Sequence, residues 1–394
     1  MKFILISAWF PPTSLQGGVV ESSYRISTSL TDLGHEVVVI CTDAGKKSSK
    51  SYASSISKKN KKAPTIIRCH VFISEFYGVT LNLYRIFKAI KSRPDMLIAN
   101  ELFSFISIVS MVFAHLLKVP YILFPRGALM PNVIKKSTSK KYFIKFIGNF
   151  LVKKSNCICV TSEAEKQAIQ YLFKIKSLTI DIISNGCYKF DFSNFFDKNE
   201  FNFLLNGSEK QRIVLFLNRI SKEKRLDRLM DAWDNLQSSI DNSVLVIAGD
   251  GDKNIIKWLN GRIQQRRLKN KVLYVGPIYG DMKWRLMSRS DVFILPSMSE
   301  NFGNVVTESL MSKTPVVATK GTPWAELNSY NCGIWVENTT SGIEHGIKVL
   351  LSYTPSKRSL MGENGFNLVI SKYTWQKAAE KIVFRAKSIK RSSL

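Results

Sequence analysis

Acidic residues are scarce in this sequence. Of its 394 residues, 30 are Asp or Glu and 57 are Lys or Arg, so the formal net charge is +27. An excess of this size predicts a polyanionic neighbour: nucleic acid, an anionic membrane surface or a phosphorylated ligand. A Lys-rich, solvated surface is the alternative interpretation, because the Lys residues are scattered along the chain as well as clustered.

Histidine and cysteine are scarce as well. The four His and six Cys form no C-x-x-C pattern, so the raw material for a metal site is poor. We expect no metal site, no cofactor and reduced cysteines, and these expectations indicate a cytoplasmic protein.

Long hydrophobic runs are absent. The longest, LFSFISIVSMVFAHLL (102–117), contains Ser and His and falls short of the roughly 20 residues that span a bilayer, so we expect a buried helix. The N-terminal stretch MKFILISAWFPP lacks the longer apolar core and the cleavage site of a signal peptide, and we expect a buried first strand there.

The sequence does contain a regular alternation of short apolar runs with helical patterns. This alternation is typical of parallel sheets with crossover helices, and the chain is too long for one ordinary core. We therefore predict an α/β protein with two Rossmann-like, doubly wound domains that face each other across a cleft. The expected strands are KFILISA, EVVVICT, TIIRCHV, MLIAN, PYILFP, CICVTS and IDIIS, followed by RIVLFLN, SVLVIAG, KVLYVG, DVFILPS, PVVATK and CGIWVE.

The alternation breaks once, in a Phe/Asn-rich stretch. We predict a first domain over 1–187, a linker over 188–211 and a second domain over 212–370. The last segment, 371–394, is predicted to form an amphipathic helix that crosses back to the first domain.

The motif SENFGNVVTESL (299–310) places scarce carboxylates after the predicted strand DVFILPS. Glu300 is expected in the loop and Glu308 about one turn into a helix, with Asn304 as its N-cap. Phe302 and Gly303 between them let the backbone approach a ligand, while helix N–H groups suit a phosphate and carboxylates accept bonds from sugar hydroxyls. A nucleotide sugar has both kinds of group. The alternative for Glu308 is a first-turn Glu favoured by the helix dipole.

Fixed cations follow the first strand of the second half. Arg219 and Lys224 lie at a strand end and a helix start, where they would stabilise the charge of a departing diphosphate. The Gly17–Gly18 pair after the first strand is another turn that lets an anion approach. It lacks the full G-x-G-x-x-G of a dinucleotide fold.

The segment 132–156 is basic with aromatic residues at helical spacing. One interpretation is an interfacial helix on anionic lipid. The other is an ordinary amphipathic helix that packs on the sheet with its Lys residues in water.

Taken together, these motifs resemble one family. SENFGNVVTESL, PVVAT, RISKEKRLD, ISNG and GGVVESSYRISTSLTDLGHEVVVICT are similar to family 4 glycosyltransferases of GT-B fold, in the expected order over nearly the whole chain. VGPIYGDMKWRLMSRSDVFILPSMSENFGN, GTPWAELNSYNCGIWV and PRGAL resemble a branch that builds bacterial surface polysaccharides.

The resemblance implies a role for each matching residue. Glu300 would contact the hydroxyls of the donor sugar, Glu308 would bind the nucleotide ribose, and Arg219 and Lys224 would hold the diphosphate. The family retains anomeric configuration, and most of its members need no metal.

The glycines of the motifs have implied roles too. Gly17 and Gly18 would let the first domain close on the phosphates, and Gly303 and Asn304 would offer backbone N–H groups to the donor.

Arg126 is a departure from the family pattern. Many relatives have His-Gly where this chain has Arg126-Gly127, and Arg stays protonated and cannot act as a general base. It could instead bind a phosphate of the donor or the acceptor. This fits a front-face reaction in which the leaving phosphate receives the acceptor proton.

The resulting hypothesis is a retaining, metal-independent hexosyltransferase on the inner face of a bacterial cytoplasmic membrane. A UDP-sugar is favoured as the donor and a GDP-sugar comes next. The acceptor would be a lipid-linked saccharide in O-antigen, lipopolysaccharide, capsule or exopolysaccharide synthesis. The alternatives are a GT-B phosphorylase or epimerase-like enzyme, a non-catalytic sugar-nucleotide-binding protein, and a basic nucleic-acid-binding protein, for which no reading module is present.

Overall fold

The computed structural model describes most of the chain as two compact units. Unit 1 comprises residues 1–186 and 375–394, and unit 2 comprises residues 187–374. The described residues are 1–13, 17–44, 63–73, 79–135, 137–175, 178–190, 211–240, 242–264, 268 and 271–392. Most of the predicted linker, 191–210, lies outside them.

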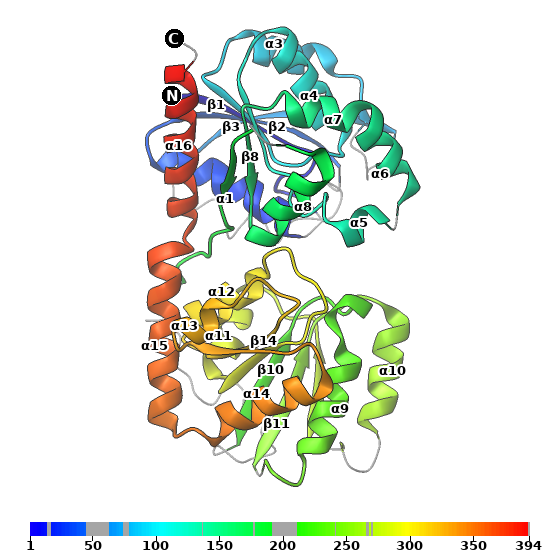
Figure 1. Ribbon diagram of the computed structural model, residues 1–394, viewed down its shortest axis with the longest axis vertical. Helices are drawn as coiled ribbons and strands as arrows, with labels where there is room; N and C mark the ends of the chain where they lie inside the picture. The colour runs from blue at the N-terminus through cyan, green and yellow to red at the C-terminus, as the bar shows by residue number, and fades with distance from the viewer. Residues whose placement is uncertain are drawn as a thin grey trace. The chain divides into compact units, whose positions relative to one another are not determined.

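Unit 1 is built on a parallel sheet with the strand order β3-β2-β1-β6-β7-β8-β9 (Figure 1). Its strands are β1 (Lys2–Ser7), β2 (Glu36–Thr42), β3 (Thr65–Cys69), β6 (Met96–Ala99), β7 (Tyr121–Leu123), β8 (Cys157–Val160) and β9 (Ile180–Ile182), with a small antiparallel pair of β4 (Val71–Ile73) and β5 (Val79–Thr80). Its helices are α1 (Gly18–Asp32), α3 (Leu83–Lys91), α4 (Phe105–Leu116), α5 (Pro131–Lys135), α6 (Thr138–Phe143), the π-helical η2 (Ile144–Gly148), α7 (Asn149–Lys153), α8 (Glu163–Phe173) and α16 (Trp375–Ser392).

Both faces of this sheet are covered, as its continuous apolar strands require. Along β1, Phe3 and Leu5 pack with α1 and α16, whereas Ile4 and Ile6 pack with α3, α4 and α8. The run at 102–117 is largely the half-buried helix α4. Among the described residues, no helix is long and apolar enough to cross a bilayer.

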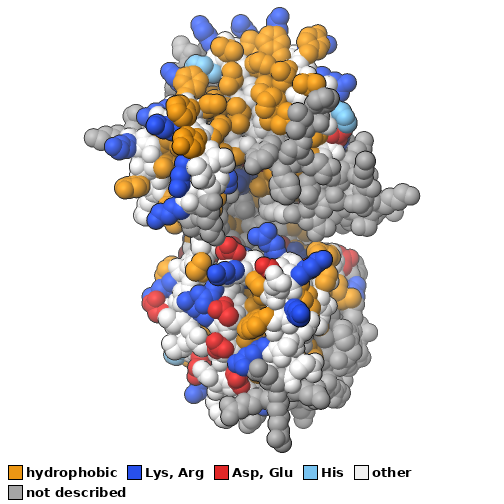
Figure 2. Space-filling model, turned by 90° about the vertical axis from the view of Figure 1, so that its right-hand side faces the viewer, with side chains coloured by type: hydrophobic (Ala, Val, Ile, Leu, Met, Phe, Trp, Pro, Cys, Tyr) orange, Lys and Arg blue, Asp and Glu red, His pale blue; other side chains and the backbone are white. Residues whose placement is uncertain are grey.

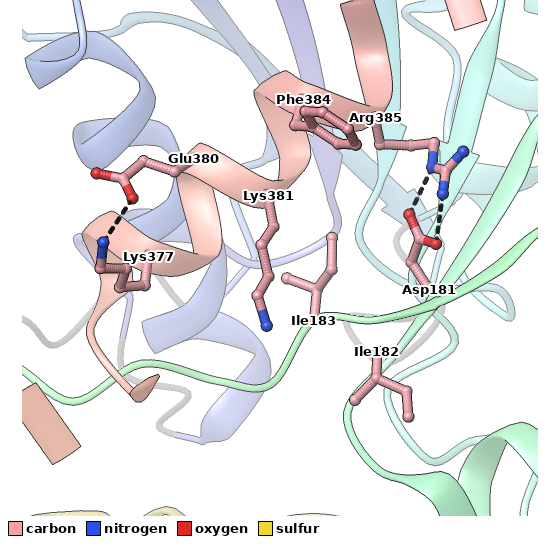
Figure 3. A pocket seen from close by; sticks show the side chains of 8 residues that line it. All are labelled: Asp181, Ile182, Ile183, Lys377, Glu380, Lys381, Phe384 and Arg385. Atoms are coloured by element: carbon pink, nitrogen blue, oxygen red, sulfur yellow. Dashed lines mark hydrogen bonds and ion pairs between the residues drawn. The ribbon is translucent and has the colours of Figure 1, made fainter. Parts of the chain in front are cut away.

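The C-terminal helix α16 belongs to unit 1, where it packs along α1. At the edge strand β9, Arg385 forms a two-bond ion pair with Asp181, at 2.5 and 2.7 Å (Figure 3). The same helix lines an open pocket of about 430 Å³ against Ile182 and Ile183.

Unit 2 repeats the design with the strand order β12-β11-β10-β13-β14-β15. Its strands are β10 (Arg212–Leu217), β11 (Ser243–Ala248), β12 (Val272–Gly276), β13 (Val292–Leu295), β14 (Val316–Thr319) and β15 (Gly333–Val336). Its helices are the 3₁₀ turn η4 (Lys222–Lys224), α9 (Leu226–Leu236), α10 (Lys253–Ile263), α11 (Gly280–Arg289), α12 (Asn304–Met311), α13 (Glu326–Ser329), α14 (Thr340–Ser352) and α15 (Pro355–Lys372).

The two faces of the unit 2 sheet are also covered by different helices. Val214 and Phe216 of β10 pack with α9, α10 and α14, and Ile213 and Leu215 pack with α11, α12 and α15. All thirteen predicted strands are present, so the predicted fold class, two Rossmann-like α/β domains, is confirmed.

Candidate active site

Each sheet has one point at which its connections reverse direction. In unit 2 this point lies between β10 and β13, which pair in parallel although β11 and β12 separate them in sequence. In unit 1 it lies between β1 and β6. Loops leaving the carboxyl ends of two such strands diverge and leave room for a ligand. Most of the predicted site residues lie in these loops or at the helix starts that follow them, whereas Arg126 follows β7 and Glu308 lies within a helix.

In unit 2, Lys224 and Glu300 meet beside this reversal point. Lys224 follows β10 and Glu300 follows β13, and the ammonium Nζ forms an ion pair with Oε1 of the carboxylate. Their side chains are only 12% and 14% exposed. The structure therefore brings together two of the predicted residues from opposite sides of the reversal point.

The loop that carries Glu300 is held from several directions. The Ser297 hydroxyl donates to the Glu300 carboxylate at 2.9 Å, and the Glu300 N–H donates to the carbonyl of Gly321 at 2.9 Å. A Cβ added at Gly321 would lie 2.3 Å from the carbonyl oxygen of Met298, so a side chain has no room there. Gly321, which stands in the GTPW stretch after β14, was not predicted as a site residue.

Gly303 sets the start of α12. It has φ of +84°, in the left-handed region that favours glycine, and it is the N-cap residue. Asn304 is the first helical residue, so the prediction that Asn304 caps the helix is wrong. A left-handed residue is needed to turn the chain from the loop into the helix, and only Gly303 adopts that conformation without strain.

Phe302 is part of the core of unit 2. Its ring is 5% exposed and lies 5.2 Å from the ring of Trp324 and 5.7 Å from that of Tyr373, measured between centroids. Its carbonyl accepts a 2.5 Å hydrogen bond from the Trp324 indole. Phe302 therefore fixes the loop, and its ring does not point to solvent.

Glu308 lies on the second turn of α12 and pairs with Lys283 of α11 at 2.7 Å. The two side chains are 20% and 22% exposed. Because the first turn of α12 contains no acidic residue, the helix-dipole alternative for Glu308 is wrong. Lys283 was not predicted either, since nothing in its local sequence pattern distinguishes it from other lysines.

Arg219 is exposed just beyond β10. Within the described part of the chain its guanidinium makes no hydrogen bond or ion pair, while its backbone N–H donates to the Asn218 side chain at 2.8 Å. Its cation is thus available to an anionic ligand, in contrast to the paired Lys224.

In unit 1, Asn100 connects several elements at the carboxyl end of β6. Its amide nitrogen donates to the hydroxyl of Ser23 on α1 at 2.6 Å, and its carbonyl oxygen accepts from Nε and Nη2 of Arg126 at 2.9 and 2.6 Å. Arg126 follows β7, and its Nη1 donates to Asn185 at 2.7 Å. Asn100 and Asn185 were not predicted as site residues, although Asn185 stands in the ISNG motif.

Arg126 is half-buried, with φ of +55° and its guanidinium 4.5 Å from the ring centroid of Phe124. Burial lowers the pKa of Arg126 to about 10, although the negative charge of Glu165 partly offsets the shift. The guanidinium therefore remains protonated at neutral pH. Three of its five N–H groups are engaged by the two Asn side chains, which leaves donors for an anion.

Glu165 holds the turn after Arg126 in place. Its carboxylate accepts the Gly127 N–H at 2.5 Å and the Thr161 N–H at 2.9 Å, and it is fully buried. The S-x-x-E spacing from the N-cap Ser162 was the available sequence signal for this residue.

Gly17 and Gly18 stand at the start of α1, as the N-cap and the first helical residue. A Cβ at Gly17 would meet no atom within 4 Å, so packing inside unit 1 does not require glycine there. Asn100 also reaches this turn, with its amide 3.5 Å from the carbonyl of Val19. Asn100 thus links Arg126 to the first turn of α1, which begins at Gly18.

A second buried carboxylate, Glu101, accepts the Ala8 N–H beside this network. Burial raises its pKa to about 6, although the bond from Ala8 opposes the shift. Glu101 therefore ties the loop after β1 to the loop after β6, and it was not predicted.

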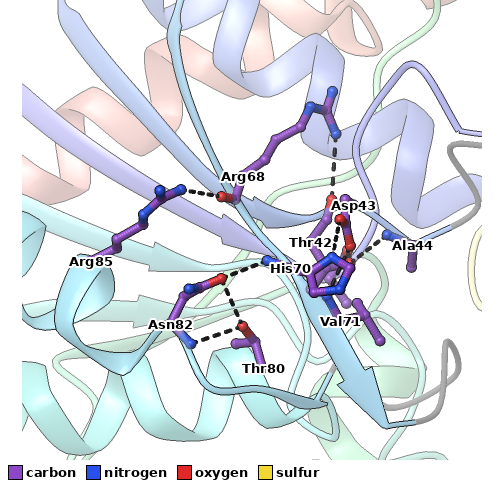
Figure 4. Close-up of polar contacts among 10 residues, drawn as sticks. Thr42, Asp43, Ala44, Arg68, His70, Val71, Thr80, Asn82 and Arg85 are labelled. Carbon is purple, nitrogen blue, oxygen red and sulfur yellow. Dashed lines mark hydrogen bonds and ion pairs between the residues drawn. The ribbon is translucent and has the colours of Figure 1, made fainter.

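The ends of β2 and β3 carry a further polar cluster (Figure 4). His70 and Asp43 form a 2.7 Å contact, and Asp43 also accepts the Val71 N–H at 2.9 Å. Burial raises the pKa of Asp43, but its hydrogen bonds with His70 and Val71 outweigh this effect, so the pKa lies below its ordinary value. Arg68 donates to the carbonyl of Pro11 at 2.5 Å and so holds the loop after β1.

The predicted residues thus form two separate clusters. Unit 2 holds Arg219, Lys224 and Glu300 around one strand junction, with Glu308 in its own pair on α12. Unit 1 holds Arg126 and the glycine turn. Among the described residues, no group of His, Cys, Asp or Glu could hold a metal ion.

Comparison with known proteins gives two family matches. The model of Glycosyltransferase Family 4 matches residues 16–187, and the model of Glycosyl transferases group 1 matches residues 197–368. An uncharacterised glycosyltransferase of Methanocaldococcus jannaschii is 26% identical over 59% of this chain and 60% of its own length, so the chain covers less than two thirds of that relative.

Two further relatives are similar over a longer span. The UDP-Gal:alpha-D-GlcNAc-diphosphoundecaprenol alpha-1,3-galactosyltransferase of Escherichia coli is 24% identical over 81% of each chain. The crystal structure of Anabaena HepE in complex with UDP and glucose superposes with a TM-score of 0.74 at 16% identity, over 98% of this chain and all of HepE. At that identity the similarity to HepE concerns the fold alone.

Proposed function

This chain belongs to the family 4 glycosyltransferases of GT-B fold, and on that basis we propose that it moves a hexose from a nucleoside diphosphate sugar to a hydroxyl of a lipid-linked saccharide. UDP is the favoured nucleotide, with GDP next. Two comparisons support this choice: one relative is described as using UDP-Gal and an undecaprenol-linked acceptor, and HepE was crystallised with UDP.

The observation that carries the proposal is the Lys224–Glu300 pair at the strand reversal of unit 2. Its two groups are nearly buried and oppositely charged, and the exposed cation Arg219 lies on the same connection as Lys224. A diphosphate sugar has a use for each of them. Its anionic phosphates would bind Arg219 and Lys224, and its sugar hydroxyls would donate to Glu300.

Glu308 would bind the ribose of the donor. Its carboxylate accepts hydrogen bonds and is held in place by Lys283 at 2.7 Å. The backbone beyond Gly303 would supply N–H donors at the start of α12.

The reaction would proceed on one face of the sugar. The oxygen of the acceptor hydroxyl forms the new bond to the anomeric carbon, and the bond from that carbon to the diphosphate oxygen breaks. The departing phosphate oxygen takes the acceptor proton, so no separate base is required and the anomeric configuration is retained. Arg219 and Lys224 would stabilise the charge that develops on phosphate without a metal ion. Arg126 would bind a phosphate of the donor or the acceptor.

The proposed setting is the inner face of a bacterial cytoplasmic membrane, during synthesis of O-antigen, lipopolysaccharide or another surface polysaccharide. This setting follows from the lipid-linked acceptor and the charge of +27.

Turnover with an undecaprenyl-diphosphate saccharide tests the proposal. Purified protein is supplied with UDP- and GDP-hexoses in the presence of EDTA, and the anomeric configuration of the product is read by NMR. We expect transfer from one nucleotide sugar with retention. A product of inverted configuration, or binding without any transfer, would refute the mechanism, and the second result would indicate the non-catalytic alternative.

A further inference from the structure

One surface of unit 1 exposes an unusual number of large apolar side chains. They lie on the end of α4 and on α6, η2 and α7: Leu116, Tyr142, Phe146, Ile147 and Phe150, each between 45% and 69% exposed. We call this set the apolar surface. Figure 2 shows hydrophobic side chains gathered on unit 1, with Lys and Arg among and around them.

The helical segment beneath this surface has two apolar sides. Ile144, Leu151 and Val152 are buried against unit 1, whereas Phe146 and Phe150 face outward. The wide π-helical turn η2 lies between α6 and α7, where the sequence predicted one continuous helix. Packing on the sheet therefore accounts for only one of the two apolar sides.

The segment that carries this surface has charges of a single sign. Residues 102 to 162 include nine Lys or Arg and no Asp or Glu. Lys141, Lys145 and Lys153 alternate with the exposed aromatic residues, and all three are exposed. Repulsion between these charges disfavours a second copy of the chain as the partner.

A basic groove of about 510 Å³ adjoins the apolar surface at the amino ends of β6, β7 and β8. Its lining includes Asp95, His115, Lys118, Lys154 and Lys390. The His115 ring lies 5.1 Å from the ring of Phe150, measured between centroids, so groove and surface are continuous.

The cations of this groove differ in their partners. Lys390 pairs with Asp95. Lys118 and Lys154 make no ion pair or side-chain hydrogen bond within the described residues. The groove thus keeps two uncompensated ammonium groups beside exposed aromatic and aliphatic side chains.

We propose that this combined surface docks on a bilayer that contains anionic phospholipid. The groove takes the phosphate of a headgroup through Lys118 and Lys154, while the apolar surface enters the boundary between headgroups and acyl chains. A nucleic acid would bind the cations and stack on the aromatic rings, but it would not require the exposed aliphatic side chains of Leu116 and Ile147. The inference deepens the proposed function, on whose lipid-linked acceptor it rests.

Vesicle co-sedimentation of the full chain tests the docking surface. Vesicles of phosphatidylcholine alone are compared with an equal mixture of phosphatidylcholine and phosphatidylglycerol. Each Lys near an anionic surface contributes roughly fivefold to partitioning, so Lys118→Glu with Lys154→Glu should weaken binding to the mixture by about 25-fold or more. Phe146→Ser with Ile147→Ser should weaken it by about tenfold.

Matched controls lie on other surfaces. Lys257→Glu with Lys348→Glu makes the same change of charge at exposed positions of unit 2, and Tyr171→Ser removes an 86% exposed ring from α8. Both should leave binding within about twofold. Equal losses in the controls and the test variants would overturn the proposal, because they would show a general charge effect. Loss of heparin binding with unchanged vesicle binding would overturn it in favour of a nucleic acid.

Calorimetry with UDP on the same samples separates this inference from the proposed function. Nucleotide binding without association with anionic vesicles refutes the docking surface alone. Vesicle association without binding of any nucleotide refutes the proposed function alone. Unchanged UDP binding in the four surface variants also shows that they are folded.

Discussion

The two sheets of this protein reverse direction in the same way, but they place different chemistry at the reversal. In unit 2 the side chains are charged and paired, Lys224 with Glu300, and Glu308 on α12 is paired with Lys283. In unit 1 the central cation, Arg126, is held by the neutral oxygens of Asn100 and Asn185.

The two arrangements suit different ligand chemistry. Paired charges hold one another in place before a ligand arrives and present both an acceptor and a cation to it, which suits a sugar diphosphate. A cation bound by amides keeps more of its charge for an incoming anion, and Glu165 nearby only partly offsets it. We expect unit 2 to fix the donor and unit 1 to supply a phosphate contact.

The largest expected effect comes from breaking the paired charges of unit 2. Glu300→Gln keeps the shape but removes the charge that holds Lys224 and accepts the sugar hydroxyls. We expect kcat/KM to fall by about 10²- to 10³-fold, comparable to the loss of a fixed electrostatic group in other enzymes. Steady-state turnover with the preferred nucleotide sugar is the measurement.

Glu337→Gln is the matched control, because Glu337 pairs with Lys320 on the exposed surface of the same unit. It should retain activity within about twofold. A Glu300→Gln enzyme as active as this control would show that the paired site is not where the donor reacts.

The next effect tests the amide-bound cation of unit 1. Arg126→Lys keeps the charge but cannot reach Asn100 and Asn185 at once, because an ammonium lacks the planar fork. We expect kcat to fall by about 30-fold, or about 2 kcal/mol. The idea of a phosphate contact is refuted if Arg126→Lys keeps full turnover while Arg126→His raises it.

A third effect concerns Glu101, which the proposed reaction does not use. Its pKa is raised to about 6 in the folded protein, so the native state holds a proton that the unfolded state has released between about pH 4.5 and 6. The stability that this group contributes is therefore present below pH 4.5 and lost as the pH rises through 6, by about 2 kcal/mol.

Glu101→Gln should remove that pH dependence, because a Gln side chain does not titrate. The amide oxygen still accepts the Ala8 N–H, so the contact between the two loops is kept. Denaturant unfolding of the wild-type and Glu101→Gln proteins from pH 4 to pH 7 gives the difference in their free energies of unfolding. The titrations of all other groups cancel in this difference. Parallel curves for the two proteins would show that Glu101 titrates normally.

The smallest expected effect on stability comes from a glycine of unit 1, and it is compared with a glycine of unit 2. Gly17→Ala in unit 1 should change the free energy of unfolding by less than about 0.5 kcal/mol, because the new Cβ meets no atom within 4 Å. If the turn binds phosphate, the same change should raise KM for the donor several-fold. Gly321→Ala in unit 2 is the contrast, since its Cβ would lie 2.5 Å from the carbonyl of Ser297 and must destabilise the unit. Equal unfolding curves for the two variants would contradict the claim that Gly321, unlike Gly17, has no room for a side chain.

The fold was predictable because its signals are local. Each of the thirteen short apolar runs contains a strand, and the amphipathic C-terminal segment becomes α16. The short β4–β5 pair was missed, because strands of three and two residues leave no periodic pattern. The segment 132–156 was expected to form one helix, but it contains four shorter elements, α5, α6, η2 and α7, since hydrophobic spacing does not reveal a π-helical turn.

The site was predictable only in part. Glu300 and Glu308 lie in one motif and Arg219 and Lys224 in another, so each pair could be found from spacing. Their partners could not, because Lys283 reaches Glu308 only through the packing of α11 on α12. The unit 1 network likewise joins residues from separate strands, and the order of strands in a sheet is not written in local periodicity.

Calorimetric titration with UDP and GDP, first without metal and then with magnesium, tests the central claim most directly. We predict that one nucleotide binds without metal, that magnesium leaves its affinity within about twofold, and that Glu308→Ala weakens it about tenfold while Glu337→Ala does not. Binding that requires magnesium, or that is indifferent to Glu308, would contradict the assignment of the donor site to unit 2.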